Sequence, residues 1–198
     1  MYPTVKRFLD ICISAVSLVV FSPLLLLTAL LVRLTSPGPA VFTQKRAGRN
    51  GKIFTIYKFR TMRRDTPSNL ATHLLSNPES FITPIGRLLR KTSLDELPQL
   101  FNVLRGDMSL IGPRPALFNQ YDLIRLREEA GVNRVRPGLT GWAQVNGRDL
   151  LSIPEKVAYD REYVENLSLR FDLKCLLRSF TSVLSADGVK EGGTGRRS

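Results

Sequence analysis

The chain is poor in the side chains that usually bind zinc or form disulfides. It has two cysteines and a single histidine among 198 residues. Cys12 and Cys175 lie in separate apolar stretches without metal-like spacing, and His73 stands alone in a polar stretch. This pattern argues against a zinc site and against a disulfide framework.

Acidic side chains are also scarce. The 17 Asp and Glu residues stand against 29 Lys and Arg residues, so the formal net charge is +12. Such a charge favours an anionic partner, and three kinds are open: nucleic acid, anionic lipid and phosphorylated substrates. The sequence shows no internal repeat and no sign of a second domain. The roughly 165 residues outside the apolar N-terminal region suffice for one domain with a core of its own.

The longest uncharged stretch runs from residue 11 to residue 32 and has Ser22 and Pro23 at its middle. As a single helix it would be about 33 Å long, enough to cross the hydrocarbon core of a bilayer. Pro23 lacks an amide donor and crowds the carbonyl four residues earlier, so we expect a bend about halfway along. The Ser22 hydroxyl could then satisfy a carbonyl that Pro23 leaves free.

Basic residues flank this stretch on both sides and indicate its topology. Lys6 and Arg7 precede it, and Arg33 is the first of several basic residues that follow. Positive charge marks the cytoplasmic side of a membrane, so both ends are expected there. We therefore expect a re-entrant helix that enters and leaves by one face, with a Pro-kinked transmembrane helix as the alternative. A cleaved signal peptide is disfavoured, because the stretch is too long and lacks a small-residue cleavage site.

The next segment predicts a small β-hairpin. Residues 36–39 read Ser-Pro-Gly-Pro, which ends any helix. Residues 41–44 and 53–60 carry bulky and β-branched side chains, and the Gly-Arg-Asn-Gly sequence of residues 48–51 supplies a turn between them. The polar stretch of residues 63–84 predicts a mobile loop.

Helices are predicted in the second half of the chain, separated by a coil. One is expected over residues 85–91 and another from Ser93 onward. The stretch from Gly106 to Gly147 is dense in glycine and proline and predicts a structured coil. Ser152-Ile-Pro-Glu155 reads as a capping box that opens a helix ending near residue 166.

Residues 169–184 predict an amphipathic helix. Leucines and a phenylalanine recur on one face, and Arg170, Lys174 and Arg178 recur on another. This pattern is typical of a helix that lies in a membrane interface. A basic surface helix packed on the core is the alternative.

Asp95 and Glu96 are the most conspicuous neighbouring carboxylates of this basic chain. Helix capping alone would explain them, because Ser93 and Glu96 have capping-box spacing and acids are favourable near a helix N-terminus. The same place suits chemistry, since the free amides of a helix N-terminus hold phosphate oxygens. A carboxylate that stays charged beside a phosphate can act as a nucleophile or hold a divalent metal. Neighbours on a helix point about 100° apart, so the two carboxylates could divide these roles.

An attack of one anion on another requires positive charge nearby. Arg114 is the favoured source, because the prolines on either side fix the backbone that presents it. Most arginines of a basic protein are merely solvated, so each of the others has a weaker claim. Trp142 could stack on a base, but a buried tryptophan is more often part of a core. The candidate cations are Lys58, Arg60, Arg90, Arg114, Arg136 and Arg148.

Five motifs carry a family resemblance. They are residues 58–62 (KFRTM), 93–99 (SLDELPQ), 102–109 (NVLRGDMS), 112–115 (GPRP) and 136–148 (RPGLTGWAQVNGR). In this order they resemble the bacterial sugar transferases, which are monotopic polyprenyl-phosphate phosphoglycosyl transferases. The likeness covers nearly the whole chain, whose size is similar to that of the small stand-alone catalytic-domain type.

The resemblance implies transfer of a sugar-1-phosphate from a UDP-sugar to undecaprenyl phosphate, with release of UMP, at the start of bacterial glycan assembly. In such enzymes the Asp of the Asp-Glu pair attacks the phosphate that bears the sugar and forms a covalent intermediate, so Asp95 would be the nucleophile. Glu96, together with Asp95, would hold Mg²⁺. The remaining matched residues would contact phosphates or order the site: Lys58, Arg90, Arg114 and Arg148.

The residue patterns and the resemblance agree on an α+β fold that is mainly helical. Ser22-Pro23 matches the break of the family's re-entrant helix, so residues 1–35 are expected to enter the bacterial inner membrane from the cytoplasmic face. Residues 36–188 would form the membrane-associated catalytic domain on that face, and residues 189–198 a disordered tail.

The expected partners are the UDP-sugar, undecaprenyl phosphate and membrane lipid, without nucleic acid. The alternative function is a membrane-tethered basic module that binds anionic lipid or nucleic acid. The sequence does not determine which UDP-sugar is the donor. An acetamido sugar such as di-N-acetylbacillosamine suits the short relatives, whereas glucose or galactose suits the longer ones. The glycan pathway and the oligomeric state stay open too.

Overall fold

The computed structural model describes residues 2–67, 77–147 and 150–185. The predicted tail, Arg148, His73 and much of the predicted loop lie outside these residues. Over the described part the fold is mainly helical with a small antiparallel sheet, as the sequence predicts, and it has a second small sheet that the sequence did not predict. The helices and strands are α1 (Tyr2–Val20), α2 (Ser22–Thr35), β1 (Val41–Ala47), β2 (Ile53–Phe59), α3 (Pro84–Thr92), α4 (Leu100–Arg105), β3 (Ser109–Ile111), α5 (Tyr121–Glu129), β4 (Gly138–Thr140), α6 (Trp142–Val145), α7 (Ile153–Glu165) and α8 (Leu169–Ser185).

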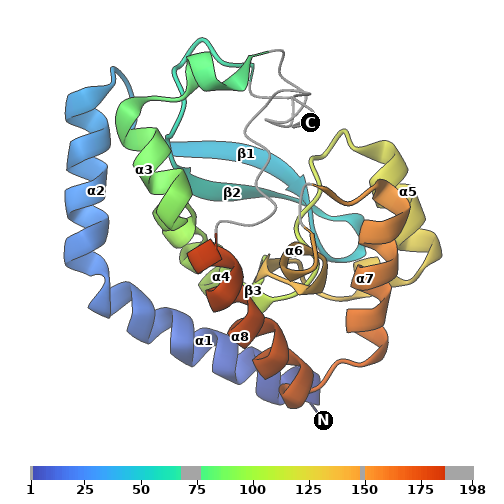
Figure 1. Cartoon of the computed structure of the whole chain (residues 1–198). Helices are drawn as coiled ribbons and strands as arrows, with labels where there is room; N and C mark the ends of the chain where they lie inside the picture. Colours follow the sequence, from blue (N-terminus) through green and yellow to red (C-terminus); the bar gives the residue numbers. More distant parts are fainter. Residues whose placement is uncertain (1, 68–76, 148–149, 186–198) are drawn as a thin grey trace.

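The first two helices form a bent arm along one edge of the molecule (Figure 1). They meet at Ser22-Pro23 with an angle of 63° between them, so the predicted bend is confirmed. The Ser22 hydroxyl donates to the carbonyl of Val19 over 2.8 Å, which is the carbonyl that Pro23 leaves without an amide donor. Among the described residues no single helix is long and apolar enough to cross a membrane. The bent pair α1 and α2, taken together, has the length and composition that crossing a membrane requires.

Polar contacts fasten the first ten residues of α1 to the domain. Asp10 is buried and accepts hydrogen bonds from the Ser109 hydroxyl (2.8 Å) and the Leu110 amide (3.1 Å). Lys6 donates to Asp172 of α8 over 2.7 Å. Arg7 donates to two carbonyls at the end of α4. The arm is therefore joined to the domain at its polar end, while most of its apolar side chains are exposed.

The predicted hairpin is confirmed. Strands β1 and β2 pair antiparallel with Val41 opposite Phe59 and Ala47 opposite Ile53. The turn between them contains a short 3-10 helix, Arg49–Gly51, in which Asn50 has a φ of 54° and Gly51 a φ of 72°. Asparagine and glycine tolerate these left-handed values best, which explains why this sequence turns here.

The prediction of coil throughout residues 106–147 is wrong. This stretch contains the parallel strands β3 and β4 as well as α5 and α6. Its glycines allow backbones to approach closely instead of keeping the chain irregular. A Cβ at Gly138 would lie 2.1 Å from the amide nitrogen of Gly112, and one at Gly141 would lie 2.0 Å from the Gly112 carbonyl oxygen.

The prediction that Ser93 caps a helix is also wrong. Ser93 follows α3 with a φ of 56°, and its side chain makes no capping bond to the next segment. That segment is a six-residue 3-10 helix, Leu94–Gln99, called η4. Pro98 lies inside η4 and cannot donate an amide, which disfavours a regular α-helix there. By contrast, the capping box of Ser152 and Glu155 is present at the start of α7.

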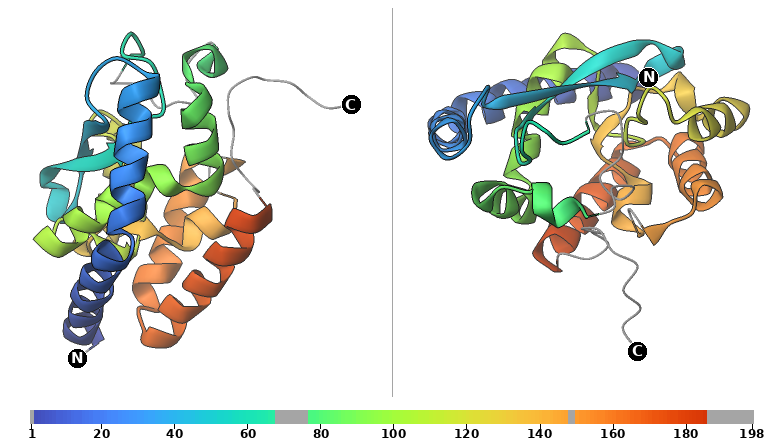
Figure 2. Two further views of the ribbon diagram at one scale, coloured as in Figure 1. Left: turned by 90° about the vertical axis from the view of Figure 1, so that its left-hand side faces the viewer. Right: turned by 90° about the horizontal axis from the view of Figure 1, so that it is seen from above.

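The core lies between α6, α7 and α8 on one side and beneath the hairpin on the other. Trp142 is buried, stacks edge-on against Phe171 at a centroid distance of 5.0 Å, and donates its indole N–H to Glu162. It is a core residue, as its size favours. Under the hairpin, Ile56 packs with Val103 and Met108. Figure 2 shows the hairpin and α5–α7 grouped beside the α1–α2 arm.

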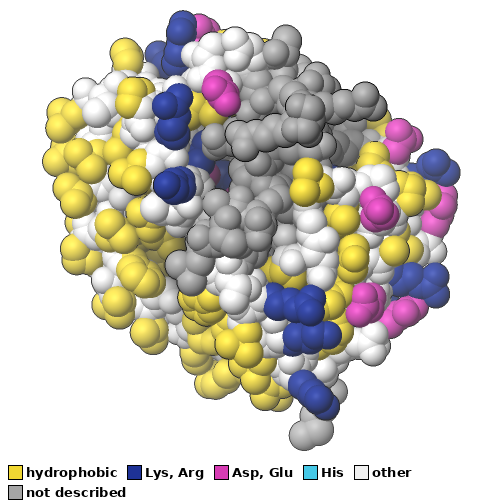
Figure 3. Space-filling model, in the orientation of Figure 1, with side chains coloured by type: hydrophobic (Ala, Val, Ile, Leu, Met, Phe, Trp, Pro, Cys, Tyr) yellow, Lys and Arg dark blue, Asp and Glu magenta, His cyan; other side chains and the backbone are white. Residues whose placement is uncertain are grey.

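Apolar side chains also remain exposed in large numbers on α1, α2 and α8. In Figure 3 they cover the left edge, over α2, and the lower left, whereas basic side chains lie over α8 and charges of both signs gather over α5 and α7. On α8 the buried face is formed by Asp172 and Cys175, and the leucines point outward. The exposed apolar residues of α8 are Leu169, Leu173, Leu176, Leu177 and Phe180.

Candidate active site

The hairpin and η4 bring a lysine and a glutamate together. Lys58 comes from β2 and Glu96 from η4, and the lysine Nζ lies 2.7 Å from Glu96 Oε1. Arg114 reaches the same oxygen with its Nη2 at 2.9 Å. Both cations are largely buried, since the Lys58 side chain is 16% exposed and the Arg114 side chain 32%. Glu96 is thus held by two cations on one oxygen.

Asp95 lies beside this cluster without a bond of that kind. It is buried, and no side chain among the described residues donates a hydrogen bond to its carboxylate. Burial and the neighbouring Glu96 raise the pKa of Asp95, while Lys58, Arg90 and Arg114 pull that pKa down. The ionisation of Asp95 is therefore set by burial, which raises its pKa, and by three cations, which lower it, and not by a helix N-terminus alone.

The pKa values of the two carboxyls are shifted in opposite directions. Burial would raise the pKa of Glu96, but Arg114 and Lys58 outweigh it and hold that pKa well below its usual range. Burial lowers the pKa of Lys58, an effect that Glu96 opposes. Glu96 is therefore the member of the pair whose charged form is favoured, and Asp95 is the member to which no described side chain donates a hydrogen bond.

Three predicted cations lie around the acid pair. Lys58 and Arg114 contact Glu96 directly, and Arg90 from α3 contributes to the field at Asp95. A group of positive side chains around two carboxylates suits an incoming diphosphate, because the cations can offset its charge.

Two other predicted cations are bonded elsewhere. Arg60 is buried and donates to the carbonyls of Ser36 (2.7 Å) and Pro37 (2.9 Å), so it fastens the loop that follows α2. Arg136 donates to the Gly106 carbonyl over 2.8 Å. Arg60 lies just beyond the end of β2, where the chain leaves the hairpin. Among the described residues, neither Arg60 nor Arg136 bonds to the carboxylate of Asp95 or Glu96.

Sequence reasoning missed Arg46, which lies close to the acid pair. Burial and the neighbouring Arg114 lower the pKa of Arg46 to about 9, while Glu96 opposes the shift. Its Nη1 donates to the carbonyl of Pro115 over 3.0 Å. A signal was available, because strand alternation places Arg46 on the same, half-buried face as Phe42 and Gln44.

Comparison with known proteins shows the family. The family model described as bacterial sugar transferase matches residues 1–186. This chain belongs to the bacterial sugar transferase family. The resemblance predicted from the five motifs is confirmed.

Relatives of this bacterial sugar transferase carry informative names. Uncharacterized sugar transferase EpsL of Bacillus subtilis is 44% identical over 94% of this chain and 90% of its own length. The UDP-glucose:undecaprenyl-phosphate glucose-1-phosphate transferase of Caulobacter vibrioides is 44% identical over 93% of this chain and 71% of its own. The UDP-N-acetylgalactosamine-undecaprenyl-phosphate N-acetylgalactosaminephosphotransferase of Aeromonas hydrophila is 38% identical, and the match covers 96% of this chain but 46% of the relative.

The acid pair fits Mg²⁺ when a substrate supplies further ligands. No group of three or more His, Cys, Asp or Glu side chains among the described residues could hold a metal. Mg²⁺ is commonly bound by one or two carboxylates together with substrate phosphates and water. Glu96 and Asp95 supply carboxylate oxygens of this kind, and the bonds from Lys58 and Arg114 both end on Oε1 of Glu96.

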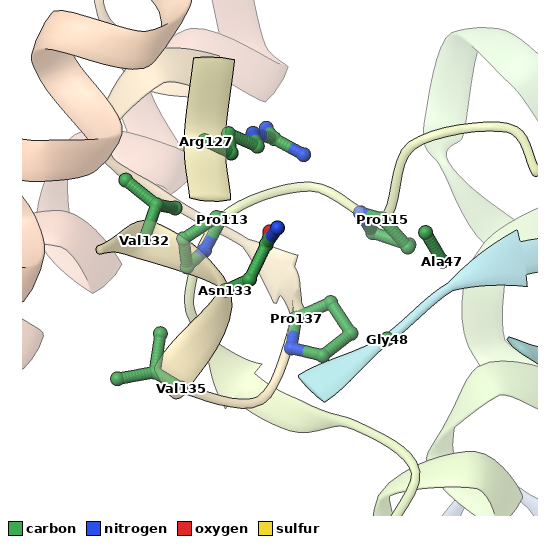
Figure 4. Close-up of a pocket in the computed structure, with 9 residues that line it drawn as sticks. All are labelled: Ala47, Gly48, Pro113, Pro115, Arg127, Val132, Asn133, Val135 and Pro137. Carbon is green, nitrogen blue, oxygen red and sulfur yellow. The ribbon is translucent and has the colours of Figure 1, made fainter. Parts of the chain in front are cut away.

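A small hollow lies behind the segment that carries Arg114. Figure 4 shows it between the hairpin turn and the prolines on both sides of that arginine. Arg127 of α5 extends its side chain along one wall, toward the backbone between Pro113 and Pro115. Neither Asp95 nor Glu96 lines this hollow, so it is separate from the acid pair.

Proposed function

We propose that this bacterial sugar transferase moves a sugar-1-phosphate from a UDP-sugar to undecaprenyl phosphate and releases UMP, as the first step of a bacterial glycan assembly. The names of the Caulobacter and Aeromonas relatives support a phosphoglycosyl transferase of this kind. One observation carries the proposal. Asp95 is buried and has no donor among the described side chains, while its neighbour Glu96 is held by Lys58 and Arg114.

The reaction proceeds in two displacements. A carboxylate oxygen of Asp95 attacks the phosphorus that bears the sugar, and the bond from that phosphorus to the bridging oxygen breaks. UMP leaves with the electron pair, and the sugar phosphate stays on Asp95 as an acyl phosphate. An oxygen of undecaprenyl phosphate then attacks the same phosphorus, which frees the Asp95 carboxylate and gives the sugar-diphospholipid.

The residues around Asp95 make these steps possible. Burial removes water from the carboxylate, which makes it a better nucleophile and limits hydrolysis of the acyl phosphate. Lys58, Arg90 and Arg114 offset the negative charge of the diphosphate, which would otherwise repel the attacking carboxylate. Bound to Glu96 and Asp95, Mg²⁺ would add to this charge compensation and assist the departure of UMP.

The exposed apolar surface supports a reaction at a membrane. We propose that the bent arm of α1 and α2 re-enters the inner membrane from the cytoplasmic face and that α8 lies in the interface. The 63° bend and the outward-facing leucines of α8 support this arrangement. A soluble nucleotide-sugar and a lipid phosphate can meet only at the depth of the headgroups, where such a surface would hold the cation cluster.

The test is UMP release by detergent-solubilised protein with Mg²⁺, undecaprenyl phosphate and a panel of UDP-sugars. The panel contains UDP-glucose, UDP-galactose, UDP-N-acetylgalactosamine and UDP-di-N-acetylbacillosamine. Asp95→Asn is expected to abolish release with every donor, because an amide is not a nucleophile of the required strength. Asp122→Asn, the same change at an exposed residue of α5, is expected to leave release unchanged.

Two outcomes would overturn the proposal. Full turnover by the Asp95→Asn variant would show that Asp95 is not the nucleophile. No release by the unmodified protein from any donor, together with vesicle or nucleic-acid binding that falls steeply with salt and ignores Asp95, would favour a membrane-tethered basic binding module instead.

A further inference from the structure

Arg114 comes from a segment that has no secondary structure to hold it. Residues 112–116 belong to neither a helix nor a strand. Pro113 and Pro115 lack amide hydrogens, so this segment has few donors with which to join a sheet. The rest of the protein therefore fixes this backbone mainly through hydrogen bonds to its carbonyl oxygens. The position of the Arg114 guanidinium beside Glu96 therefore depends on what holds these carbonyls.

The segment is joined to β4 at its start, where the Gly138 amide donates to the Pro113 carbonyl over 2.9 Å. Beyond that point, three successive carbonyls are each bonded to a different donor. The Arg114 carbonyl accepts from Arg127 Nη1 over 2.7 Å. The Pro115 carbonyl accepts from Arg46 Nη1 over 3.0 Å, and the Ala116 carbonyl accepts from the Ala47 amide over 2.9 Å. The donors come from α5 on one side and from the end of β1 on the other. The segment is thus held between the helical part of the domain and the hairpin.

Arg127 is itself held in a buried ion pair. Its Nε and Nη2 donate to one oxygen of Asp160, over 2.9 Å and 2.6 Å. Arg127 is 5% exposed and Asp160 is 1% exposed. The pair joins α5 to α7 and leaves Nη1 pointing at the backbone that carries Arg114, as the close-up of this region shows (Figure 4).

Stability alone is a poor explanation for this ion pair. Removing two charges from water is costly, and buried pairs can often be replaced by apolar residues of similar volume without loss of stability. An apolar pair could fill the same space between α5 and α7. It could not donate a hydrogen bond to the Arg114 carbonyl, which is the property that the arginine adds.

We propose that Arg46 and the Arg127–Asp160 pair form a clamp that positions Arg114 for the transfer reaction. The clamp residues touch neither the acid pair nor the reacting phosphate through these bonds, and they act on the reaction through the backbone of Arg114. They are positioning residues. This inference rests on the proposed function for its effect on turnover, while the clamp itself can be measured without turnover.

The variant Arg127→Met with Asp160→Leu removes the ion-pair half of the clamp while filling its volume, and leaves Arg46 in place. We expect the protein to fold with a melting temperature close to that of the unmodified protein. Hydrogen exchange should become faster at the amides of residues 114–117, which are those of Arg114, Ala116 and Leu117 because Pro115 has none, since their backbone loses a fixed carbonyl. Turnover should fall about 100-fold, the size of effect that a displacement of about 1 Å can produce, with most of the loss in kcat.

A double-mutant cycle separates positioning from a general structural effect. Arg114→Met removes the guanidinium that the clamp positions, so adding the clamp variant to it should cause no further loss of turnover. Losses that multiply in the combined variant would show that the pair acts independently of Arg114 and would overturn the proposal. Arg125→Met with Glu129→Leu, the same side-chain changes at an exposed ion pair of α5, should alter neither exchange at residues 114–117 nor turnover.

A second variant tests the clamp if the first variant does not fold. Arg46→Met removes the donor to the Pro115 carbonyl from the hairpin side and should give the same faster exchange and the same dependence on Arg114. Unchanged exchange at residues 114–117 in a folded clamp variant would overturn the clamp. Inactivity of the unmodified protein would overturn the proposed function, and the exchange measurement would still decide the clamp.

Discussion

At the scale of single residues, the two neighbouring acids have different surroundings. Glu96 is fixed by Lys58 and Arg114 through one oxygen, whereas Asp95 has no hydrogen-bond donor among the described side chains. Adjacent positions in a short 3-10 helix point in different directions, so one carboxylate can face the cations while the other stays open to a substrate. The division of roles that the proposed function requires is therefore already present in the side-chain contacts.

The change Glu96→Gln tests this division. The amide oxygen can still accept hydrogen bonds, but the charge that holds Lys58 and Arg114 is lost. We expect UMP release to fall at least about 100-fold, as when one preorganised electrostatic contact is removed. We expect the free energy of unfolding to fall by about 1–3 kcal/mol, because hydrogen bonds to charged groups are stronger than neutral ones.

The matched control is Glu165→Gln. Glu165 pairs with Arg161 on the exposed surface of α7, and an exposed pair contributes at most about 1 kcal/mol. This variant should retain both turnover and stability. Equal turnover of Glu96→Gln and Glu165→Gln would contradict an essential charge at Glu96.

At the scale of secondary-structure elements, local patterns predicted the hairpin, the capping box at Ser152 and the bend at Pro23. Each depends on residues close together in the chain. The capping pattern at Ser93 failed because Ser93 instead ends α3 with a positive φ, and the Glu96 carboxylate is bonded to residues from β2 and from the Arg114 segment. That choice depends on tertiary contacts, which a local pattern cannot contain.

The candidate site shows the same limit. Lys58 and Arg60 lie two residues apart, yet only Lys58 contacts the acid pair, because β2 ends between them at Phe59. Arg46 and Arg127 were not predicted, since their roles come from bonds to carbonyls 69 and 13 residues away in the chain. The motifs thus pointed to the acid pair and three of its cations, and the contacts that hold them became visible only in the fold.

The bent arm of α1 and α2 gives an element-scale prediction of topology. We expect cysteines at position 4 and position 52, introduced after Cys12→Ser and Cys175→Ala, to react with an impermeant thiol reagent only from the cytoplasmic side. Both positions are exposed in the structure. With Pro23→Ala the bend should be relieved, and the fraction labelled at position 4 from outside should rise. Labelling of position 4 from outside in the unmodified protein would mean that the arm crosses the membrane.

At the scale of the whole molecule, the exposed apolar side chains gather on the arm and on α8. On α8 they lie beside basic side chains, while α5 and α7 carry charges of both signs (Figure 3). A soluble protein seldom leaves so extensive an apolar surface uncovered. The polar contacts of Asp10 and Lys6 join the arm to the domain beside α8, so these apolar faces are held in a fixed relation to the cation cluster.

Fluorescent labels can test which face meets the membrane. Leu177 and Tyr121 are similarly exposed, at 68% and 72%, on α8 and α5 respectively. In protein reconstituted into vesicles with anionic lipid, an environment-sensitive label at position 177 should shift to the blue and be quenched by a lipid-borne quencher. A label at position 121 should remain in water. The same aqueous signal from both positions would contradict an interfacial α8.

The most direct test of the central claim is mass spectrometry of the protein after mixing with its UDP-sugar and Mg²⁺ in the absence of undecaprenyl phosphate. The account predicts that one sugar phosphate is added to the peptide that contains Asp95, that undecaprenyl phosphate removes it, and that Asp95→Asn never acquires it. Turnover without any adduct under rapid quenching, or an adduct on another residue, would contradict Asp95 as the nucleophile.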